Sequence, residues 1–361
     1  MVITGATGFL GGQLLRHLRK EYRIVALGRR TPKEAGAPEG PGIEWFQVDL
    51  ADLDALKAVF RSIAERGGAE LLLHMAAYYD FTGEDNPEYQ RTNVQGTRNL
   101  LELAPELKLR RFIHTGSVAA CPFPPPGEAI TEATPPDADF PYARAKKASE
   151  ALVREASGRV PTCIVRPAAV FSDWCEYQPL DEFLRTWCSR RWNSRILGGK
   201  GLSAVPYLHV DDLLSFYLRV VERCDDLAPA EVLVASPDGC TSHAELFREV
   251  TRCWSGAARA PWLVPRPLAA AGIRAREGLG RLTGRMPFER SWMVDYIDLQ
   301  LRIDASRTRR RLDWAPSRKL HLLGRLPVLI ENLRLHPAEW TEINLRRKKV
   351  QAPLPPRWGA A

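Results

Sequence analysis

Short apolar segments alternate with longer amphipathic segments through the first half of the chain, and this alternation constrains the fold more than any other feature. The strand candidates are Met1–Thr4, Arg23–Leu27, Ile43–Gln47, Glu70–Met75, Arg111–Thr115 and Pro161–Pro167. Apolar residues at three- and four-residue spacing predict helices between them, at Gly11–Lys20, Leu53–Arg66, Tyr89–Leu103 and Ala143–Glu155. The rhythm is typical of βαβ units, so we expect an α/β fold with a doubly wound parallel sheet.

A glycine-rich turn, Thr4-Gly5-Ala6-Thr7-Gly8-Phe9-Leu10-Gly11, lies between the first predicted strand and the first predicted helix. Glycine allows a positive φ and a close backbone approach, while a helix N-terminus presents unpaired N–H groups and the positive end of its dipole. An anionic pyrophosphate fits there. The turn therefore predicts a dinucleotide site at Gly5, Thr7, Gly8, Phe9 and Leu10, with a purely structural turn as the alternative.

Two arginines, Arg29 and Arg30, follow the second predicted strand, where a protein that binds NAD usually carries an acidic residue for the ribose 2'-hydroxyl. A guanidinium group suits a 2'-phosphate, whereas a carboxylate would repel it. The sequence therefore favours NADP as the cofactor, with NAD as the alternative. The other interpretation of Arg29 and Arg30 is that both point into solvent.

Tyr142 and Lys146 are four residues apart on a predicted helix, so their side chains share one face. A nearby ammonium group lowers the pKa of a tyrosine from about 10 towards neutrality, which suits general acid-base catalysis. This spacing alone also occurs on many surface helices. Ser117, however, follows the buried strand that ends at Thr115, at the edge of the sheet where open α/β folds bind ligands.

In this order, the glycine turn, Ser117, Tyr142 and Lys146 resemble the motifs of the extended short-chain dehydrogenase/reductase family. This family includes NAD(P)-dependent epimerases and dehydratases as well as enzymes similar to 3-beta-hydroxysteroid dehydrogenase. Further segments resemble its motifs in the same order, namely Val48–Leu50, His74–Ala77, Asn93–Leu101, Arg166–Val170, His209–Asp212 and Arg302–Pro316. The resemblance implies a Rossmann-type sheet, and it implies a homodimer.

The resemblance also implies roles for individual residues. Tyr142 would donate or accept the substrate proton, Ser117 would orient the reacting oxygen, and Lys146 would bind the nicotinamide ribose and lower the pKa of Tyr142. Beyond the glycine turn, the implied cofactor contacts are Asp49, Leu50, Ala76, Ala77, Asn93, Tyr142, Lys146, Pro167 and Val170. For His74, Asn93, His209 and Asp211 a structural role is favoured over a functional one, in which buried polar groups hold loops by hydrogen bonds.

Three positions depart from the family pattern. Phe171-Ser172-Asp173 stands where Tyr-Gly-Pro is frequent, and Gly116 replaces a common serine. Residues 205–208 lack the arginine and aspartate that nucleotide-sugar enzymes usually carry, so a substrate diphosphate has no evident partner there. Apolar contact area is instead offered by Tyr78, Tyr79, Phe81, Trp174, Trp187 and Trp192. Of these, we expect Tyr78, Trp187 and Trp192 to line the substrate site, although aromatic residues are more often core than pocket.

The pattern loosens after residue 171. We expect residues 1–171 to form the NAD(P)-binding domain, with its sheet completed by segments near residues 202–235. Residues 172–345 would form mainly a smaller substrate-binding portion. Residues 346–361 would form a basic, proline-rich tail.

Composition excludes several other classes of protein. Basic residues give a net charge of +8 but are scattered, which argues against nucleic acid as a partner. Seven cysteines without a CxxC pair indicate neither a disulfide framework nor a metal site. The start of the chain resembles no signal peptide, and no apolar run reaches the length of a membrane span, so we expect a cytoplasmic protein without membrane contact. Pro261–Ile273 is apolar but short, and we expect a buried helix there in place of surface attachment to a membrane.

Together these features predict an NADP-dependent oxidoreductase that reduces a ketone or oxidises an alcohol of a mainly apolar small molecule, such as a steroid, a flavonoid or a lipid-like compound. The alternative within the family is a nucleotide-sugar epimerase or dehydratase. An alternative of another class is a noncatalytic regulatory protein that binds NADP. Ser117, Tyr142 and Lys146 together argue against it, because a mere binding protein needs no proton donor.

Overall fold

A parallel sheet forms the centre of the larger of two lobes in the computed structural model, which describes residues 1–351. Within these residues the sheet has seven strands, in the order β11-β6-β5-β4-β1-β2-β3. The strands are β1 (Val2–Thr4), β2 (Ile24–Gly28), β3 (Ile43–Gln47), β4 (Leu71–His74), β5 (Arg111–Thr115), β6 (Thr162–Pro167) and β11 (Glu231–Ala235). The chain winds outward from β1 in one direction and from β4 in the other, so the expected doubly wound fold is confirmed.

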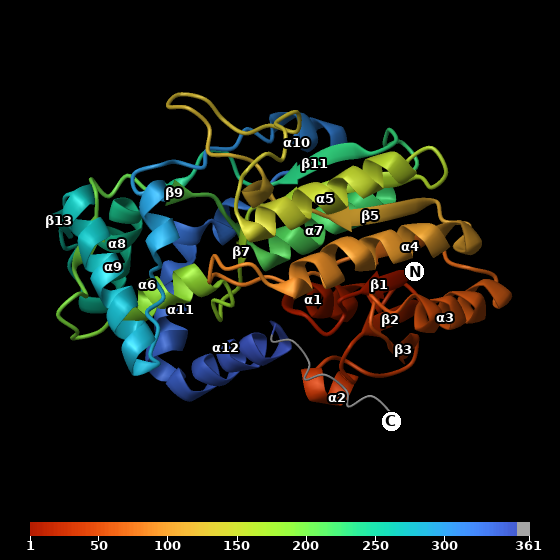
Figure 1. The fold of residues 1–361 in the computed structure, drawn as a ribbon, viewed down its shortest axis with the longest axis horizontal. Coiled ribbons are helices and arrows are strands. Elements are labelled where there is room, and N and C mark those ends of the chain that lie inside the picture. Colours follow the sequence, from red (N-terminus) through yellow and green to blue (C-terminus); the bar gives the residue numbers. More distant parts are fainter. Residues whose placement is uncertain (352–361) are drawn as a thin grey trace.

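Helices cover both faces of the sheet (Figure 1). One face packs against α1 (Phe9–Leu18) and α7 (Val210–Glu222), and the other against α3 (Leu53–Glu65), α4 (Gly96–Leu103) and α5 (Pro141–Ala156). Successive strand residues point to opposite faces, so Ile3 belongs to the first core and Val2 to the second. Because both faces are buried, the strands are apolar throughout, which made them recognisable in the sequence.

Two of the predicted helices differ from the observed ones in an informative way. The first helix begins at Phe9, two residues before the expected start, so the end of the glycine turn is already helical. The helix expected at Tyr89–Leu103 is divided into a π-helical segment, η1 (Tyr89–Gln95), followed by α4. Apolar periodicity does not distinguish a π turn from an α turn over so short a segment.

The second lobe gathers elements that are far apart in the sequence around a separate apolar core, which includes Leu184, Phe247, Leu326 and Trp340. Its helices are α6 (Gln178–Trp187), α8 (His243–Ser255), α9 (Arg266–Thr283), α11 (Leu322–Leu335) and α12 (Pro337–Gln351). Three two-stranded pairs accompany them: β7 (Ala169–Phe171) with β10 (Tyr207–His209), β9 (Ala204–Val205) with β12 (Thr241–Ser242), and β8 (Ile196–Gly198) with β13 (Trp262–Val264).

Short elements complete the described chain, and they are α2 (Pro32–Ala35), α10 (Ser306–Leu312), η2 (Ala104–Leu107), η3 (Val118–Ala120), η4 (Ser291–Tyr296) and η5 (Arg318–Leu320). The expected tail, residues 346–361, begins as the last turns of α12, and residues 352–361 lie outside the described residues. Among the residues that the structure describes, no helix is both long enough and apolar enough to cross a membrane.

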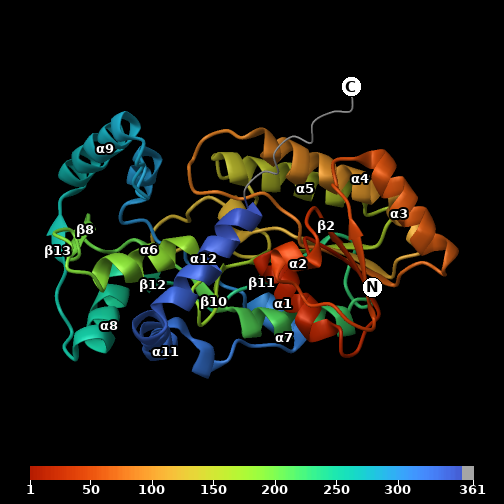
Figure 2. The ribbon, with the colours of Figure 1, turned by 90° about the horizontal axis from the view of Figure 1, so that it is seen from below.

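The expectation of a buried helix at Pro261–Ile273 is wrong. It forms β13 and the first turns of α9, and both lie at the end of the molecule opposite α3 (Figure 2). Trp262 and Leu268 are 55% and 64% exposed, so the segment is not buried. A periodic apolar pattern predicts an amphipathic helix, but it does not say whether the apolar face meets the protein core.

Candidate active site

The glycine turn joins β1 to α1 beside the end of β4, and its close packing requires glycine at two positions. Gly5 has a φ of 66°, and a Cβ atom there would lie 2.7 Å from the backbone of Ala76. A Cβ atom on Gly11 would lie 2.3 Å from the carbonyl oxygen of Gly5. The turn leads directly into α1, and the first N–H groups of a helix have no acceptor within it. This cradle fits the pyrophosphate of a dinucleotide.

A buried chain of hydrogen bonds joins the strands and the helix beside the turn. Thr4 Oγ1 lies 2.7 Å from His74 Nδ1 and accepts a bond from the Ala76 N–H at 3.2 Å. His74 Nε2 lies 2.9 Å from Thr97 Oγ1, so the ring joins β1, β4 and α4. Burial, and secondarily the charge of Lys146, lowers the pKa of His74 to about 3, so the ring is neutral at physiological pH. Its hydrogen bonds agree with the structural role.

Arg29 and Arg30 stand next to the glycine turn, because a Cβ atom on Gly28 would meet the Thr7 side chain at 2.9 Å. The Arg29 guanidinium donates to Glu88 Oε2 at 2.7 Å and is 15% exposed. Arg29 is therefore engaged in an ion pair, which no local sequence pattern indicated.

Glu88 also binds Arg91 at 3.0 Å, and Arg91 binds the Asp49 carboxylate. The three arginines Arg29, Arg30 and Arg91 thus gather beside the end of β2, together with the carboxylates of Glu88 and Asp49, and Glu34 acts on Arg30 by its charge. Asp49 and Leu50, the expected adenine contacts, follow β3 on this side, where the Leu50 carbonyl accepts a bond from Asn99 at 2.8 Å.

Ser117, Tyr142 and Lys146 are brought together at the carboxyl edge of β5. Ser117 makes a side-chain hydrogen bond with Tyr142. Its oxygen accepts a bond from the Ala119 N–H at 3.1 Å, which leaves its own proton to be donated. Lys146 Nζ lies 5.7 Å from the centre of the Tyr142 ring and donates to the Thr115 carbonyl at 2.7 Å. The three residues expected to act together are therefore neighbours in the structure.

The pKa values of this group are set mainly by burial. Burial raises the pKa of Tyr142 to about 12, and the hydrogen bond with Ser117 opposes this shift. Burial lowers the pKa of Lys146 to about 8, against the attraction of Glu150. At neutral pH Tyr142 therefore holds its proton, and the expectation that Lys146 lowers this pKa towards neutrality is not met in the cofactor-free protein. Such a phenol is poised to donate a proton to a substrate oxygen.

A buried ion pair lies directly behind the group. Arg166 on β6 makes two hydrogen bonds with Glu150 on α5, at 3.0 and 2.7 Å, and both side chains are almost completely buried. A Cβ atom on Gly116 would lie 2.6 Å from Glu150 Oε1. The departure from serine at this position has a physical reason, because the carboxylate occupies the space of a side chain.

The structure distinguishes between the neighbouring residues Tyr78 and Tyr79. Asn93 accepts a bond from the Tyr78 N–H at 2.6 Å and donates to the Tyr78 carbonyl at 3.0 Å. The Tyr78 side chain is buried, and its hydroxyl donates to Asp80 at 2.5 Å. The Tyr79 ring lies 4.6 Å from the Tyr142 ring. The structure therefore places Tyr79 beside the predicted proton donor, whereas the sequence analysis selected Tyr78.

Further rings extend from Tyr79 and Tyr142 into what we call the aromatic cluster, which comprises Tyr79, Phe81, Phe140, Tyr177, Phe288 and Trp292. Phe288 and Trp292 follow α9, so a segment distant in sequence forms part of this wall. Trp292 Nε1 donates to the Thr82 carbonyl at 3.1 Å, and its ring fills the space that a side chain at Gly83 would need. No local signal in the sequence could have joined these segments.

The expected substrate residues Trp187 and Trp192 lie elsewhere. Trp187 is 6% exposed and packs between Phe183 and Phe247 in the core of the second lobe, with ring distances of 4.7 and 5.4 Å. Trp192 is 75% exposed on a loop. The crowding of aromatic residues in the sequence is explained for Trp187 by core packing.

The remaining motif residues hold the two lobes together. Asp173, which departs from the family pattern, binds the Arg325 guanidinium of α11 and lies 3.3 Å from His209 Nε2. His209 Nδ1 caps α7 by accepting the Asp211 N–H at 3.2 Å. Pro167 ends β6 beside β11, and Val170 on β7 pairs with Leu208.

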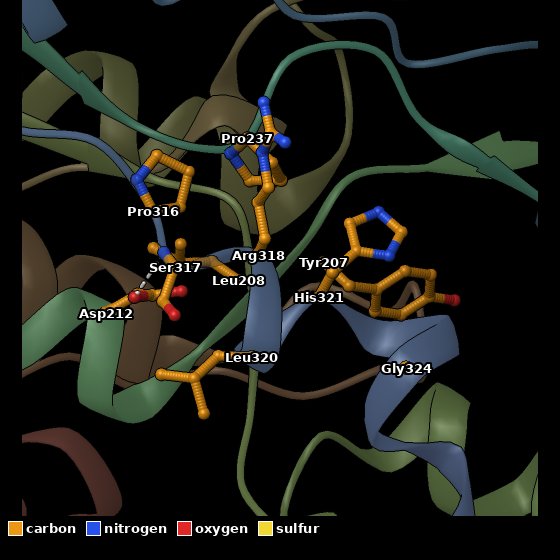
Figure 3. A pocket seen from close by; sticks show the side chains of 10 residues that line it. All are labelled: Tyr207, Leu208, Asp212, Pro237, Pro316, Ser317, Arg318, Leu320, His321 and Gly324. Carbon is orange, nitrogen blue, oxygen red and sulfur yellow. Dashed lines mark hydrogen bonds between the residues drawn. The ribbon is translucent and has the colours of Figure 1, made fainter.

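A hollow of about 330 Å³ lies behind β10, next to the hydrogen bond from the Ser317 N–H to Asp212 (Figure 3). It is lined by Tyr207, Leu208, Asp212, Pro237, Pro316, Ser317, Arg318, Leu320, His321 and Gly324. None of these is a predicted catalytic residue. The Tyr207 ring contacts Tyr177 of the aromatic cluster at 6.0 Å, and its buried hydroxyl has no hydrogen-bond partner among the described residues.

Comparison with known proteins adds independent findings. The sequence profile of the NAD dependent epimerase/dehydratase family matches residues 1–235. The chain is 32% identical over 181 residues to sterol demethylase protein B of Methylococcus capsulatus, covering 49% of this chain and 53% of that protein. It is 28% identical over 202 residues to human 3 beta-hydroxysteroid dehydrogenase type 7, covering 51% and 53%. The chain thus spans about half the length of these relatives.

Among solved structures, UDP-glucuronic acid 4-epimerase from Bacillus cereus, in complex with UDP-glucuronic acid and NAD, has a TM-score of 0.67. It is 18% identical, and the match covers 92% of this chain and 98% of that chain. At this identity the likeness concerns the fold, which both lobes share with that structure.

Proposed function

The chain belongs to the NAD dependent epimerase/dehydratase family, and from this we propose that it is an NADP-dependent oxidoreductase that interconverts a ketone and an alcohol on a mainly apolar molecule. The observation that carries the proposal is the contact of Ser117 with Tyr142, one helical turn from Lys146 and beside the aromatic cluster. A protein that only bound the cofactor would need no proton donor at this place.

Each residue of the group has a distinct task in the proposed reaction. The Tyr142 hydroxyl donates its proton to the substrate oxygen during reduction and takes it back during oxidation. Ser117 binds the same oxygen and the phenolate that forms. Lys146, held by the Thr115 carbonyl, stabilises that phenolate by its charge and binds the nicotinamide ribose. The cofactor, when bound, supplies or accepts the hydride.

The surroundings of Tyr142 support the proposed substrate class. The rings of Tyr79, Phe81 and Tyr177 offer flat apolar contact area, which suits a steroid, a flavonoid or a lipid-like molecule. The unpaired hydroxyl of Tyr207 behind them would be a polar contact for a distal substrate oxygen. Two of the similar proteins are named as sterol or steroid enzymes, which supports this choice.

The experiment is a screen of hydrophobic ketones and nucleotide sugars that follows the absorbance of the reduced cofactor and identifies the product.

We expect Tyr142→Phe to bind cofactor like the parent and to lower turnover on the order of 100-fold or more, the usual contribution of general acid-base catalysis. Tyr22→Phe, on the far side of the sheet, is the matched control. Turnover of Tyr142→Phe within threefold of the parent would refute the assignment. Conversion of a sugar without net cofactor oxidation would instead favour an epimerase or dehydratase.

The NADP preference rests on the arginines that gather beside the end of β2, next to the glycine turn. We expect Arg30, which directly follows Arg29 there, to meet the 2'-phosphate. One charge-assisted hydrogen bond contributes about 1.5–3 kcal/mol, or roughly 10- to 150-fold in affinity. Titration with both cofactors at two salt concentrations should show a loss of that size for NADP in Arg30→Ala. Arg19→Ala is the control. Equal affinity of the parent for NAD and NADP would contradict the preference.

A further inference from the structure

Helix α9 carries an apolar face that no part of the described chain covers. Leu268, Gly272, Ala275, Leu279 and Leu282 recur at alternating four- and three-residue spacing, so they share one side of the helix. Leu268, Leu279 and Leu282 are 64%, 61% and 86% exposed. The opposite side faces the protein, where Ala270, Glu277 and Gly280 are buried. The helix is amphipathic, with its larger apolar side chains turned outward.

The apolar surface continues beyond the helix. Trp262 and Leu263 on β13 are 55% and 51% exposed, and Met286 follows the helix at 37%. Of the eleven large apolar side chains that are exposed in the described part of the chain, six therefore lie between residues 262 and 286. Scattered exposed leucines are ordinary on a protein surface, but such a concentration indicates an interaction site.

Arginines flank this face on both sides. By helical geometry, Arg274 borders one edge of the apolar stripe and Arg276, which pairs with Glu289 at 3.2 Å, borders the other. Residues 259–290 contain seven arginines and two glutamates. One of these glutamates, Glu277, lies on the protein side of the helix, where it accepts from the Ser291 N–H at 2.8 Å and pairs with Arg281 at 2.9 Å, so the positive charge at the edges of the stripe is carried by Arg274 and Arg276.

We propose that α9 with β13 docks onto an anionic lipid bilayer, with the leucines and Trp262 among the acyl chains and the arginines at the headgroups. An amphipathic helix with arginines beside its apolar face lies in the membrane interface, where long basic side chains reach the phosphates. A second copy of the chain is a poor occupant, because an interface of α9 with itself would bring two arginine-rich faces together. The proposal reverses the expectation of no membrane contact, which depended on burial of this segment.

The position of α9 suggests how membrane docking would serve catalysis, an inference that rests on the proposed function. Phe288 and Trp292, which follow the helix, belong to the aromatic cluster beside Tyr142. A bilayer beneath α9 would therefore lie next to one wall of the proposed substrate site. An apolar substrate dissolved in that bilayer would have a short path to Tyr142. Membrane binding itself can be measured without any substrate.

The test is flotation of the full-length protein with vesicles of phosphatidylcholine alone or with three parts in ten of phosphatidylglycerol. We expect binding to the anionic vesicles, and a loss on the order of tenfold or more in the double variant Leu279→Glu, Leu282→Glu, because burial of two leucines is lost. The variant Leu335→Glu, Leu345→Glu is the matched control, since both leucines are exposed elsewhere. We expect Arg274→Gln, Arg276→Gln to bind both vesicle types alike.

The substituted side chains are exposed, so folding should be retained, and circular dichroism and the activity on a water-soluble substrate verify this. Absence of binding to anionic vesicles, or equal binding of the parent and the Leu279, Leu282 variant, would overturn the proposal. A dimer in sedimentation velocity that the same variant abolishes, without vesicle binding, would assign the face to a second copy. If the Leu279, Leu282 variant loses vesicle binding but keeps the turnover of the parent, the docking surface is supported separately from the active site. If the parent binds vesicles but turns over no substrate, the docking proposal stands and the proposed function fails.

Discussion

Replacement of Lys146 by methionine is expected to abolish activity. At neutral pH it should also remove the free-energy cost of burying a charged ammonium group in the folded protein. Lys146 is 3% exposed, and burial lowers its pKa from the ordinary 10.5 to about 8. The charged form is therefore disfavoured in the folded state by about 3 kcal/mol. Methionine has a similar shape and carries no charge, but it loses the bond to the Thr115 carbonyl, which contributes about 1.5–3 kcal/mol. At pH 7 we expect the variant to equal the parent in stability or to exceed it by up to about 2 kcal/mol.

The dependence on pH is the sharper test. Below pH 8 the lysine is charged in both the folded and the unfolded state, so its burial penalises folding in full. Between pH 8 and 10.5 the folded protein releases this proton first, so the penalty is removed as the pH rises. Relative to Lys146→Met, the parent should gain about 2 kcal/mol between pH 7 and pH 9.5.

Urea unfolding of the cofactor-free proteins, followed by tryptophan fluorescence at both pH values, measures this difference. Lys147→Met is the matched control, because the neighbouring Lys147 is exposed and pairs with Asp137 at the surface. Its stability relative to the parent should hardly change with pH. A stability difference between Lys146→Met and the parent that is the same at pH 7 and pH 9.5 would refute the reasoning. So would turnover of Lys146→Met close to that of the parent.

Two further predictions concern packing near and far from the site. Glu150→Gln leaves the Arg166 charge buried without its partner, so we expect a loss of about 3–5 kcal/mol in the free energy of unfolding, against almost none for the exposed Glu155→Gln; equal losses would contradict this. Trp187→Ala should cost about 3–5 kcal/mol of stability and Trp192→Ala less than about 0.5 kcal/mol, with KM unchanged in both. An altered KM in either would return that tryptophan to the substrate site.

The sheet and the proximity of Ser117, Tyr142 and Lys146 were predictable because each depends on local patterns. Strands buried on both faces are apolar runs, and parallel strands place their carboxyl ends, and hence Ser117, at one edge. The spacing of Tyr142 and Lys146 already determines a shared helical face. In such cases the chemistry is encoded within a few residues.

The rest depends on contacts between distant segments. Tyr78 and Tyr79 have the same side chain, and the bonds from Asn93 to the Tyr78 backbone decide which ring meets Tyr142. Arg29 forms an ion pair with Glu88, which is 59 residues away and which no local pattern connects to it. The apolar pattern of α9 was recognised, but its outward direction depends on how the second lobe packs.

The place of β11 in the sheet has a consequence for synthesis on the ribosome. The chain leaves the sheet after β6 and enters the second lobe before it returns as β11, and the Val234 N–H of β11 donates to Thr308 of the much later α10 at 2.9 Å. Until residue 235 has emerged, the nascent chain exposes the unpaired edge of β6. Until α10 has emerged as well, the chain exposes the unpaired edge of β11. Open strand edges favour aggregation, so we expect chains released before α10 to require chaperones, while the N-terminal segment cannot complete its fold ahead of the remainder.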